Sequence, residues 1–214
     1  MHEGTPQGAV LYFVHDPMCS WCWAFRPVWA AIVAGLPAGL RSQRLLGGLA
    51  PDSDEPMPLA MQRQIRGYWR RIQQQVPGTR FNYAFWQRCR PRRSTWPACR
   101  AVIAARQQGA AFEEPMILAI QTAYYLQARN PSARETLVQL AGEIGLATGR
   151  FRRELDSPGV QAALAGEMAL GARLGARGFP SLLLVQGNEA RLLEYSYRDP
   201  DVVLEILRPL FSES

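Results

Sequence analysis

The chain has 214 residues, 48% of them hydrophobic, so it suits one large domain or one small fold that carries an insertion. No apolar stretch is long enough to span a bilayer, which argues against a membrane-embedded protein and leads us to expect no membrane partner. All 24 basic residues are arginine, against 18 acidic residues, so the net charge is +6 and catalysis by lysine is excluded.

The arginines are unevenly distributed. Eleven of them lie between Met57 and Arg106, a stretch that contains no acidic residue. Such a block attracts anions and is compatible with nucleic acid, an acidic partner or an anionic small thiol. No nucleic-acid recognition motif accompanies the charge, so we favour solvated helix faces and expect no nucleic-acid partner.

The N-terminal residues 1–8 lack a basic segment followed by an apolar one, so they do not resemble a secretory signal. We therefore expect a cytoplasmic protein. In that reducing compartment, cysteines close together in the sequence are more often catalytic or metal-binding than structural.

The first predicted elements surround a C-x-x-C motif. Residues 10–14 form a continuous β-branched and aromatic run that predicts a strand buried on both faces, and a helical pattern extends from residue 20 to about residue 36. A thiolate at a helix N-terminus is stabilised by free backbone N–H groups and the helix dipole. We therefore expect Cys19 to be the nucleophile, with Cys22 one turn further in and more shielded.

A second strand is predicted at residues 40–46, running into Gly47-Gly48-Leu49. Residues 51–58 follow, with three prolines and three acidic residues, and they predict a connector. From there to about residue 174 the apolar spacing is helical, which we interpret as about five helices.

Three prolines mark helix starts within this helical region. Pro97 fits the first turn of one helix. Asn130-Pro131 and Ser157-Pro158 each fit an N-cap followed by proline in the first helical position.

Strand character returns at residues 181–185, directly after Gly178-Phe179-Pro180. Gly187-Asn188 predicts a hairpin turn into a strand at residues 191–195. Asp199-Pro200 then begins a last helix.

The order of these elements predicts an α/β protein with a thioredoxin fold and a large all-helical insertion between its two halves. Without the helical block, the chain reads strand, helix, strand, strand, strand, helix. We assign residues 1–56 and 175–214 to a discontinuous thioredoxin-like domain and residues 57–174 to a helical insertion domain.

The four cysteines permit several chemistries. Zinc would need two further ligands at suitable spacing, and Cys89 and Cys99, with nine residues between them, do not form a second C-x-x-C, so we expect no metal. These two residues would form a second disulfide or redox relay, or stay separate thiols with Cys99 buried in a helix. The reducing compartment favours separate thiols.

Three residues near the C-x-x-C motif have more than one interpretation. His15 and Asp16 are suited to shuttle protons to a buried thiol, or they end the strand and shape the following turn, which we favour. A carboxylate at Asp16 would oppose ionisation of Cys19, and the motif contains no cation, so we predict a moderate oxidant. Trp21, between the two cysteines, is a candidate platform for substrate.

Four segments spread over the whole chain resemble the DsbA-like thioredoxin family, and its FrnE-type cytosolic branch in particular. The most specific feature is a C-x-x-C motif combined with a downstream Phe-Pro-Ser at the head of a strand. The segments are residues 16–23 (DPMCSWCW), Gly47-Gly48-Leu49, residues 94–101 (STWPACRA) and Gly178-Phe179-Pro180-Ser181.

This resemblance implies a thiol–disulfide oxidoreductase acting on thiols or disulfides of proteins, peptides or small molecules. Cys19 would attack, Cys22 would resolve the mixed disulfide, and Pro180 would be cis and face the two sulfurs. The backbone of Phe179 would pair with an extended substrate beside Trp21. No cofactor is expected beyond the Cys19–Cys22 redox pair, with glutathione a candidate co-substrate.

In related proteins the segment matching residues 94–100 lies near the active site, so Thr95 and Arg100 are further candidates for contact with substrate or glutathione. Two other functions stay open. One is a glutathione-dependent transferase or isomerase, although relatives of that kind typically have serine in place of Cys19. The other is a non-catalytic adaptor that docks its partner on the basic residues 63–106.

Overall fold

The computed structural model describes residues 8–211. The prediction that the N-terminal residues do not form a secretory signal concerns residues 1–8, nearly all of which lie outside this range. Within the described residues, four strands form one mixed sheet in the order β2-β1-β3-β4. β1 pairs in parallel with β2 and antiparallel with β3, and β3 pairs antiparallel with β4. The strands are β1 (Val10–His15), β2 (Arg41–Leu46), β3 (Ser181–Gln186) and β4 (Glu189–Leu193).

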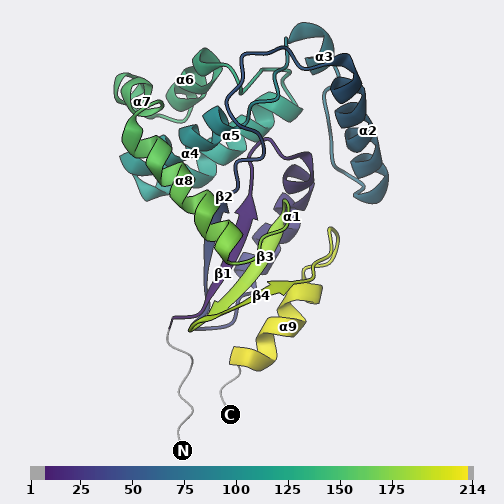
Figure 1. The fold of residues 1–214 in the computed structure, drawn as a ribbon. Helices are drawn as coiled ribbons and strands as arrows, with labels where there is room; N and C mark the ends of the chain where they lie inside the picture. Colours follow the sequence, from purple (N-terminus) through teal and green to yellow (C-terminus); the bar gives the residue numbers. More distant parts are fainter. Residues whose placement is uncertain (1–7, 212–214) are drawn as a thin grey trace, which may run out of the picture.

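β1 lies in the middle of the sheet, and its side chains alternate between two covered faces. Leu11 and Phe13 pack with residues of α1 and α9, whereas Val14 packs with Leu45 and with Leu170 of α8. Figure 1 shows α8 lying across the sheet. The prediction of a strand buried on both faces is therefore confirmed. The covering helices are α1 (Ser20–Ala34), α8 (Pro158–Arg173) and α9 (Asp201–Phe211).

The chain between β2 and β3 is helical. Its described residues form seven α-helices and one 3₁₀-helix, more than the sequence indicated, because α3 and α7 are too short to show a full helical period. None of the helices in the described part of the chain is long and apolar enough to cross a membrane. Besides α8, the elements are α2 (Leu59–Gln75), α3 (Phe85–Arg88), α4 (Trp96–Gln108), η1 (Ala110–Phe112), α5 (Glu113–Tyr125), α6 (Arg134–Glu143) and α7 (Thr148–Glu154).

Two of the three predicted helix starts are confirmed and the third is wrong. Pro97 lies in the first turn of α4, which begins at Trp96. Ser157 caps α8, because its hydroxyl accepts the N–H of Val160, and Pro158 is the first helical residue. Asn130, in contrast, does not cap a helix: its side chain accepts the N–H of Ser132 in a turn, and α6 begins only at Arg134. Asn130-Pro131 therefore forms a turn, because asparagine and proline favour turns as well as helix starts.

The buried apolar side chains form two main hydrophobic cores. One lies under the sheet between α1 and α9, and the other is centred on the helices around Trp69 and Tyr125. Met18 and Leu46 belong to the second core although they come from the loop before α1 and from the end of β2. The loop that carries the C-x-x-C motif therefore sits where the sheet meets the helical region. The division at residues 57 and 174 stays a prediction.

Candidate active site

Cys19 occupies the N-cap position of α1. Its Sγ accepts a hydrogen bond from the N–H of Cys22 at 3.4 Å, as a capping side chain does. Its thiol also lies 3.5 Å from the carbonyl oxygen of Phe179, to which it donates. The sulfur thus meets the exposed N–H end of a helix on one side and the loop before β3 on the other.

Cys22 lies deeper than Cys19, as expected, with 2% of its surface exposed against 6% for Cys19. Burial raises the pKa of the Cys22 thiol well above its usual value, and the neighbouring Cys19 acts in the same direction. Both cysteines are free thiols in this structure. Cys22 is therefore held protonated in the reduced protein.

The Phe179–Pro180 segment faces Cys19. Its peptide bond is cis, and the hydroxyl of Tyr195 donates to the carbonyl of Pro180 at 3.0 Å. The ring of Phe179 lies against Gly47: a Cβ built on Gly47 would be 1.9 Å from a Phe179 ring carbon. Glycine at this position is therefore required by the close approach of Phe179, which accounts for part of the Gly47-Gly48-Leu49 motif.

Asp16 is fully buried, and its carboxylate joins three parts of the chain. One oxygen accepts the N–H of Met18 at 2.7 Å, which shapes the turn before Cys19. The other accepts the N–H of Leu49 at 2.8 Å and the hydroxyl of Thr95 at 2.6 Å. Burial raises the pKa of the Asp16 carboxyl, and these hydrogen bonds oppose the rise.

His15 is also buried, but it differs from Asp16 in having no polar partner for its Nε2 atom among the described residues. Its ring stacks on Phe13 with 4.9 Å between the centroids. Burial lowers its pKa to about 3, and the nearby Arg44 adds to this effect. His15 is therefore neutral at physiological pH, which disfavours its use as a proton shuttle.

A cavity of about 310 Å³ opens beside Cys19, between the C-x-x-C loop, α2 and the Phe179 loop. Arg93 is the only charged side chain in its lining, and Trp21 lines it while also packing on Tyr197 at 5.0 Å between ring centroids. The contribution of α2 and Arg93 was not predicted, because it depends on how the helices pack. The lining residues are Met18, Cys19, Ser20, Trp21, Leu49, Met61, Gln64, Ile65, Tyr68, Trp69, Arg93, Tyr124, Gly178 and Phe179.

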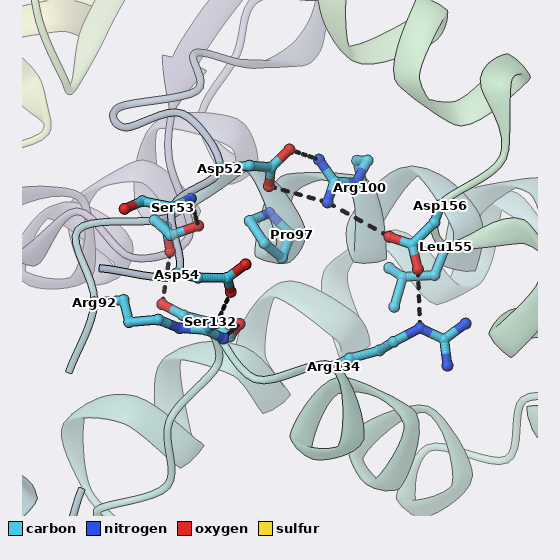
Figure 2. A pocket seen from close by; sticks show the side chains of 11 residues that line it. Asp52, Ser53, Asp54, Arg92, Pro97, Arg100, Ser132, Arg134, Leu155 and Asp156 are labelled. Atoms are coloured by element: carbon cyan, nitrogen blue, oxygen red, sulfur yellow. Dashed lines mark hydrogen bonds and ion pairs between the residues drawn. The ribbon is translucent and has the colours of Figure 1, made fainter. Parts of the chain in front are cut away.

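Arg100 does not line this cavity. It belongs to a second hollow of about 380 Å³, where its guanidinium binds Asp52 at 2.7 and 3.1 Å and approaches Asp156 at 3.5 Å (Figure 2). Asp156 also binds Arg134 at 2.9 Å, and Arg92 is paired with Asp54. Of the two candidates from the 94–100 segment, only Thr95 reaches the C-x-x-C loop, through Asp16.

Cys89 and Cys99 are free thiols in this structure, as all four cysteines are, and Cys99 is buried in a helix as expected. Cys99 is buried in α4 with its sulfur 3.5 Å from an Asp16 oxygen, and Cys89 donates to the carbonyl of Ala128 at 3.1 Å. Burial raises the pKa of both thiols. The described residues contain no group of three or more histidines, cysteines or acids suited to hold a metal ion.

A family model described as the DSBA-like thioredoxin domain matches residues 10–194. Comparison with curated proteins finds no match. Among solved structures, a candidate protein disulfide isomerase from Nitrosomonas europaea is 28% identical, with a TM-score of 0.79, and the match covers 94% of this chain and 95% of the other.

Another similar structure is the cytosolic disulfide reductase DsbM from Pseudomonas aeruginosa, 26% identical with a TM-score of 0.76 over 94% of this chain and 98% of the other. The same protein was also solved with GSH, giving 26% identity and a TM-score of 0.74 at the same coverage. These matches confirm the α/β thioredoxin fold with a helical insertion.

Proposed function

Because the chain belongs to the DsbA-like thioredoxin family, we propose that it is a thiol–disulfide oxidoreductase whose redox pair is Cys19 and Cys22. The observation that supports this most directly is the position of Cys19. Its sulfur caps α1, lies 3.5 Å from the Phe179 carbonyl and borders an open cavity. A helix N-terminus stabilises a thiolate, the form that attacks disulfides.

The proposed reaction has two exchange steps. The Cys19 thiolate attacks one sulfur of a substrate disulfide, the substrate S–S bond breaks, and one substrate thiolate leaves and takes up a proton. Cys22 then loses its proton and attacks the Cys19 sulfur, which releases the second substrate thiol and forms the Cys19–Cys22 disulfide. Two electrons pass from the protein to the substrate, and the reverse sequence oxidises a dithiol.

Asp16 is the proposed acceptor of the Cys22 proton. Its carboxyl has a raised pKa because it is buried, so it holds a proton more readily than a surface carboxylate. Burial raises the pKa of Cys22, and the Asp16 charge contributes to the same rise, which indicates that the two groups lie close together. Proton transfer to Asp16 therefore needs no direct access of water to Cys22.

The proposed substrates are thiols and disulfides of proteins, peptides or small molecules, with glutathione among them and no cofactor beyond the protein's own sulfurs. The support comes from the similar DsbM protein, which is described as a cytosolic disulfide reductase and was solved with GSH. A cytoplasmic location and the FrnE-type branch are part of the same proposal. Trp21, Phe179 and Pro180 would contact the substrate, since they lie in or next to the Cys19 cavity.

Trapping with a Cys22→Ala variant tests this function. Without the resolving thiol, the first exchange product should stay on Cys19, and mass spectrometry after incubation with glutathione disulfide should find one glutathione on that residue. A Cys89→Ala variant serves as the control, because Cys89 is a free thiol outside the cavity, and its exchange rate should equal that of the unmodified protein.

A Cys22→Ala protein that accumulates no adduct on Cys19 would contradict the proposed redox pair. The same variant also separates the two alternative functions. A glutathione transferase would keep its conjugation activity without Cys22, whereas an adaptor would retain its partner non-covalently.

A further inference from the structure

We propose that the Cys19 cavity selects disulfides that carry a carboxylate near the reacting sulfur, and that Arg93 is the residue that binds this carboxylate. The inference rests on the proposed function and specifies its substrate class. The ligand is a small-molecule disulfide or a disulfide within a short acidic segment of a peptide, rather than one particular protein. Arg93 takes no part in making or breaking bonds; it determines specificity.

The first observation is that Arg93 lacks an acidic partner. It is partly exposed, and among the described residues it forms no hydrogen bond or ion pair with its side chain. Arg93 supplies the only charge among the lining residues, none of which is acidic. Burial raises the pKa of Tyr124, and Arg93 opposes that rise, which indicates that the guanidinium lies near this cavity wall.

The second observation is that the arginines lining the adjoining hollow have acidic partners. Arg92, one residue earlier, is bound to Asp54 and to the carbonyl of Ser132. Arg100 and Arg134 share Asp156 (Figure 2). These arginines are held by carboxylates, whereas Arg93 lines the cavity that Cys19 borders and has no carboxylate partner among the described residues.

The third observation concerns the remaining walls. Gln64 donates to the hydroxyl of Tyr68 at 2.8 Å, so that hydroxyl is free to donate its own hydrogen toward the cavity. Apolar side chains, including those of Met61 and Ile65, form much of the rest. A guanidinium next to apolar walls binds a carboxylate more strongly than one surrounded by water, and it does so with two parallel hydrogen bonds.

The size of the cavity agrees with a small ligand. About 310 Å³ is at the lower end of the range for small-molecule sites. One half of a low-molecular-weight disulfide would occupy it, with its sulfur at Cys19 and its carboxylate at Arg93. Glutathione disulfide meets this description, because each half has two carboxylates.

Single-turnover oxidation of the pre-reduced protein tests the proposal without any recycling partner. Each protein is mixed with glutathione disulfide, which is anionic, or with bis(2-hydroxyethyl) disulfide, which is neutral, and the second-order rate constant is followed by tryptophan fluorescence. The Arg93→Gln variant should lose about tenfold with glutathione disulfide, the size expected of one charge-assisted hydrogen bond at a partly exposed site. With the neutral disulfide it should change by less than about twofold.

An Arg90→Gln variant is the matched control. It removes the same charge from the same chain segment, but Arg90 is exposed and does not line the cavity. Its rate constants should stay within about twofold for both disulfides, apart from the small effect of net charge on encounter. Arg93→Glu should reverse the preference, reacting faster with the cationic disulfide cystamine than with glutathione disulfide.

Two results would overturn the proposal: an equal loss for both disulfides in Arg93→Gln, or an equal loss in Arg90→Gln and Arg93→Gln with glutathione disulfide. Failure of the proposed function itself looks different. In that case, the unmodified protein would react with neither disulfide at Cys19, and the inference about Arg93 would fall with it.

Discussion

Two hollows that use neighbouring residues of one chain segment differ in charge: one combines arginines with aspartates, and the other has a single arginine. In the hollow of Figure 2, Arg92, Arg100 and Arg134 are each paired with an aspartate. In the cavity at Cys19, Arg93 has no carboxylate among the described residues. The same residue type therefore stabilises the fold in one place and is available to a ligand a few residues away.

Backbone geometry explains why adjacent arginines separate in this way. Arg92 forms a β-bridge with Pro56, so the chain is extended there. Consecutive side chains of an extended segment point in opposite directions. Arg92 consequently faces the aspartate-rich connector, and Arg93 lines the cavity beside Cys19. The number of arginines in a sequence block thus says less about function than the direction in which each one points.

The largest expected effect comes from Gly47→Ala, a substitution next to the Phe179 loop that borders the Cys19 cavity. The added methyl group would lie 1.9 Å from the Phe179 ring, so the ring must move, which disturbs the loop whose carbonyl accepts a hydrogen bond from Cys19. We expect the free energy of unfolding to fall by about 3 kcal/mol, the upper range for overpacking. The rate of disulfide exchange should fall by about tenfold or more, measured with the single-turnover assay.

Gly166→Ala is the control for that substitution. Gly166 lies within α8, and a Cβ there would meet no atom within 4 Å. Its exchange rate should be unchanged, and its stability should rise by about 0.5 to 1 kcal/mol because alanine favours the helix. Equal exchange rates in the two alanine variants would contradict the role given to the Phe179 loop.

Arg100→Met tests the other hollow and should have the next largest effect. Arg100 is 7% exposed, and the substitution removes its charge-assisted hydrogen bonds to Asp52 and Asp156. The free energy of unfolding should fall by about 2 kcal/mol, measured by urea denaturation. Disulfide exchange at low denaturant should stay within about twofold of the unmodified protein. A loss of exchange without a loss of stability would contradict the purely structural assignment of this hollow.

The smallest expected effect concerns Thr95, which joins α4 to the C-x-x-C loop. Its hydroxyl accepts the N–H of Ala50 at 3.0 Å and donates to Asp16 at 2.6 Å. Thr95→Val keeps the shape and should lower the free energy of unfolding by about 1 to 2 kcal/mol. It should also raise the pKa of Asp16 further, because this hydrogen bond lowers that pKa, so the acidic limb of the exchange-rate profile should move to higher pH. Thr95→Ser should restore both properties.

The free energy of unfolding should depend on pH, and the Asp16 carboxyl determines the direction of this dependence. Its pKa is raised in the folded protein, so its contribution is fully favourable below the unfolded value near 3.9 and is lost as pH rises through the folded value. Relative to Asp16→Asn, the unmodified protein should therefore gain stability on acidification, by at most about 1.4 kcal/mol per pH unit. A difference that is constant with pH would show that Asp16 has the same pKa in both states.

Local signals explain the features that the sequence predicts well. The apolar run before the C-x-x-C motif correctly predicted β1, and Ser157-Pro158 correctly predicted the start of α8. Both predictions depend only on residues close together in the chain. Asn130-Pro131 failed for a related reason: the same residue types form turns as readily as helix starts.

Long-range contacts explain what the sequence could not predict. Asp16 and Thr95 are separated by 79 positions, and their hydrogen bond depends on how the start of α4 is placed beside the loop after β1. Arg100 was a candidate for substrate contact and Arg93 was not, because residue spacing does not reveal which side of the segment lines the cavity at Cys19. No periodicity in the sequence distinguishes a paired arginine from an unpaired one.

The buried Asp16 carboxylate limits how freely the helical region can be exchanged between homologous proteins. It accepts hydrogen bonds from the loop after β1, from the loop after β2 and from the start of α4. The strand-bearing part and the helical part of the chain therefore both contribute donors to one carboxylate. Swapping the helical region for that of a homologue would therefore transplant a donor along with the scaffold. A chimera lacking a hydroxyl at residue 95 would lose one hydrogen bond to Asp16, so replacing the helical region would also change the pKa of an acid close to the proposed redox pair.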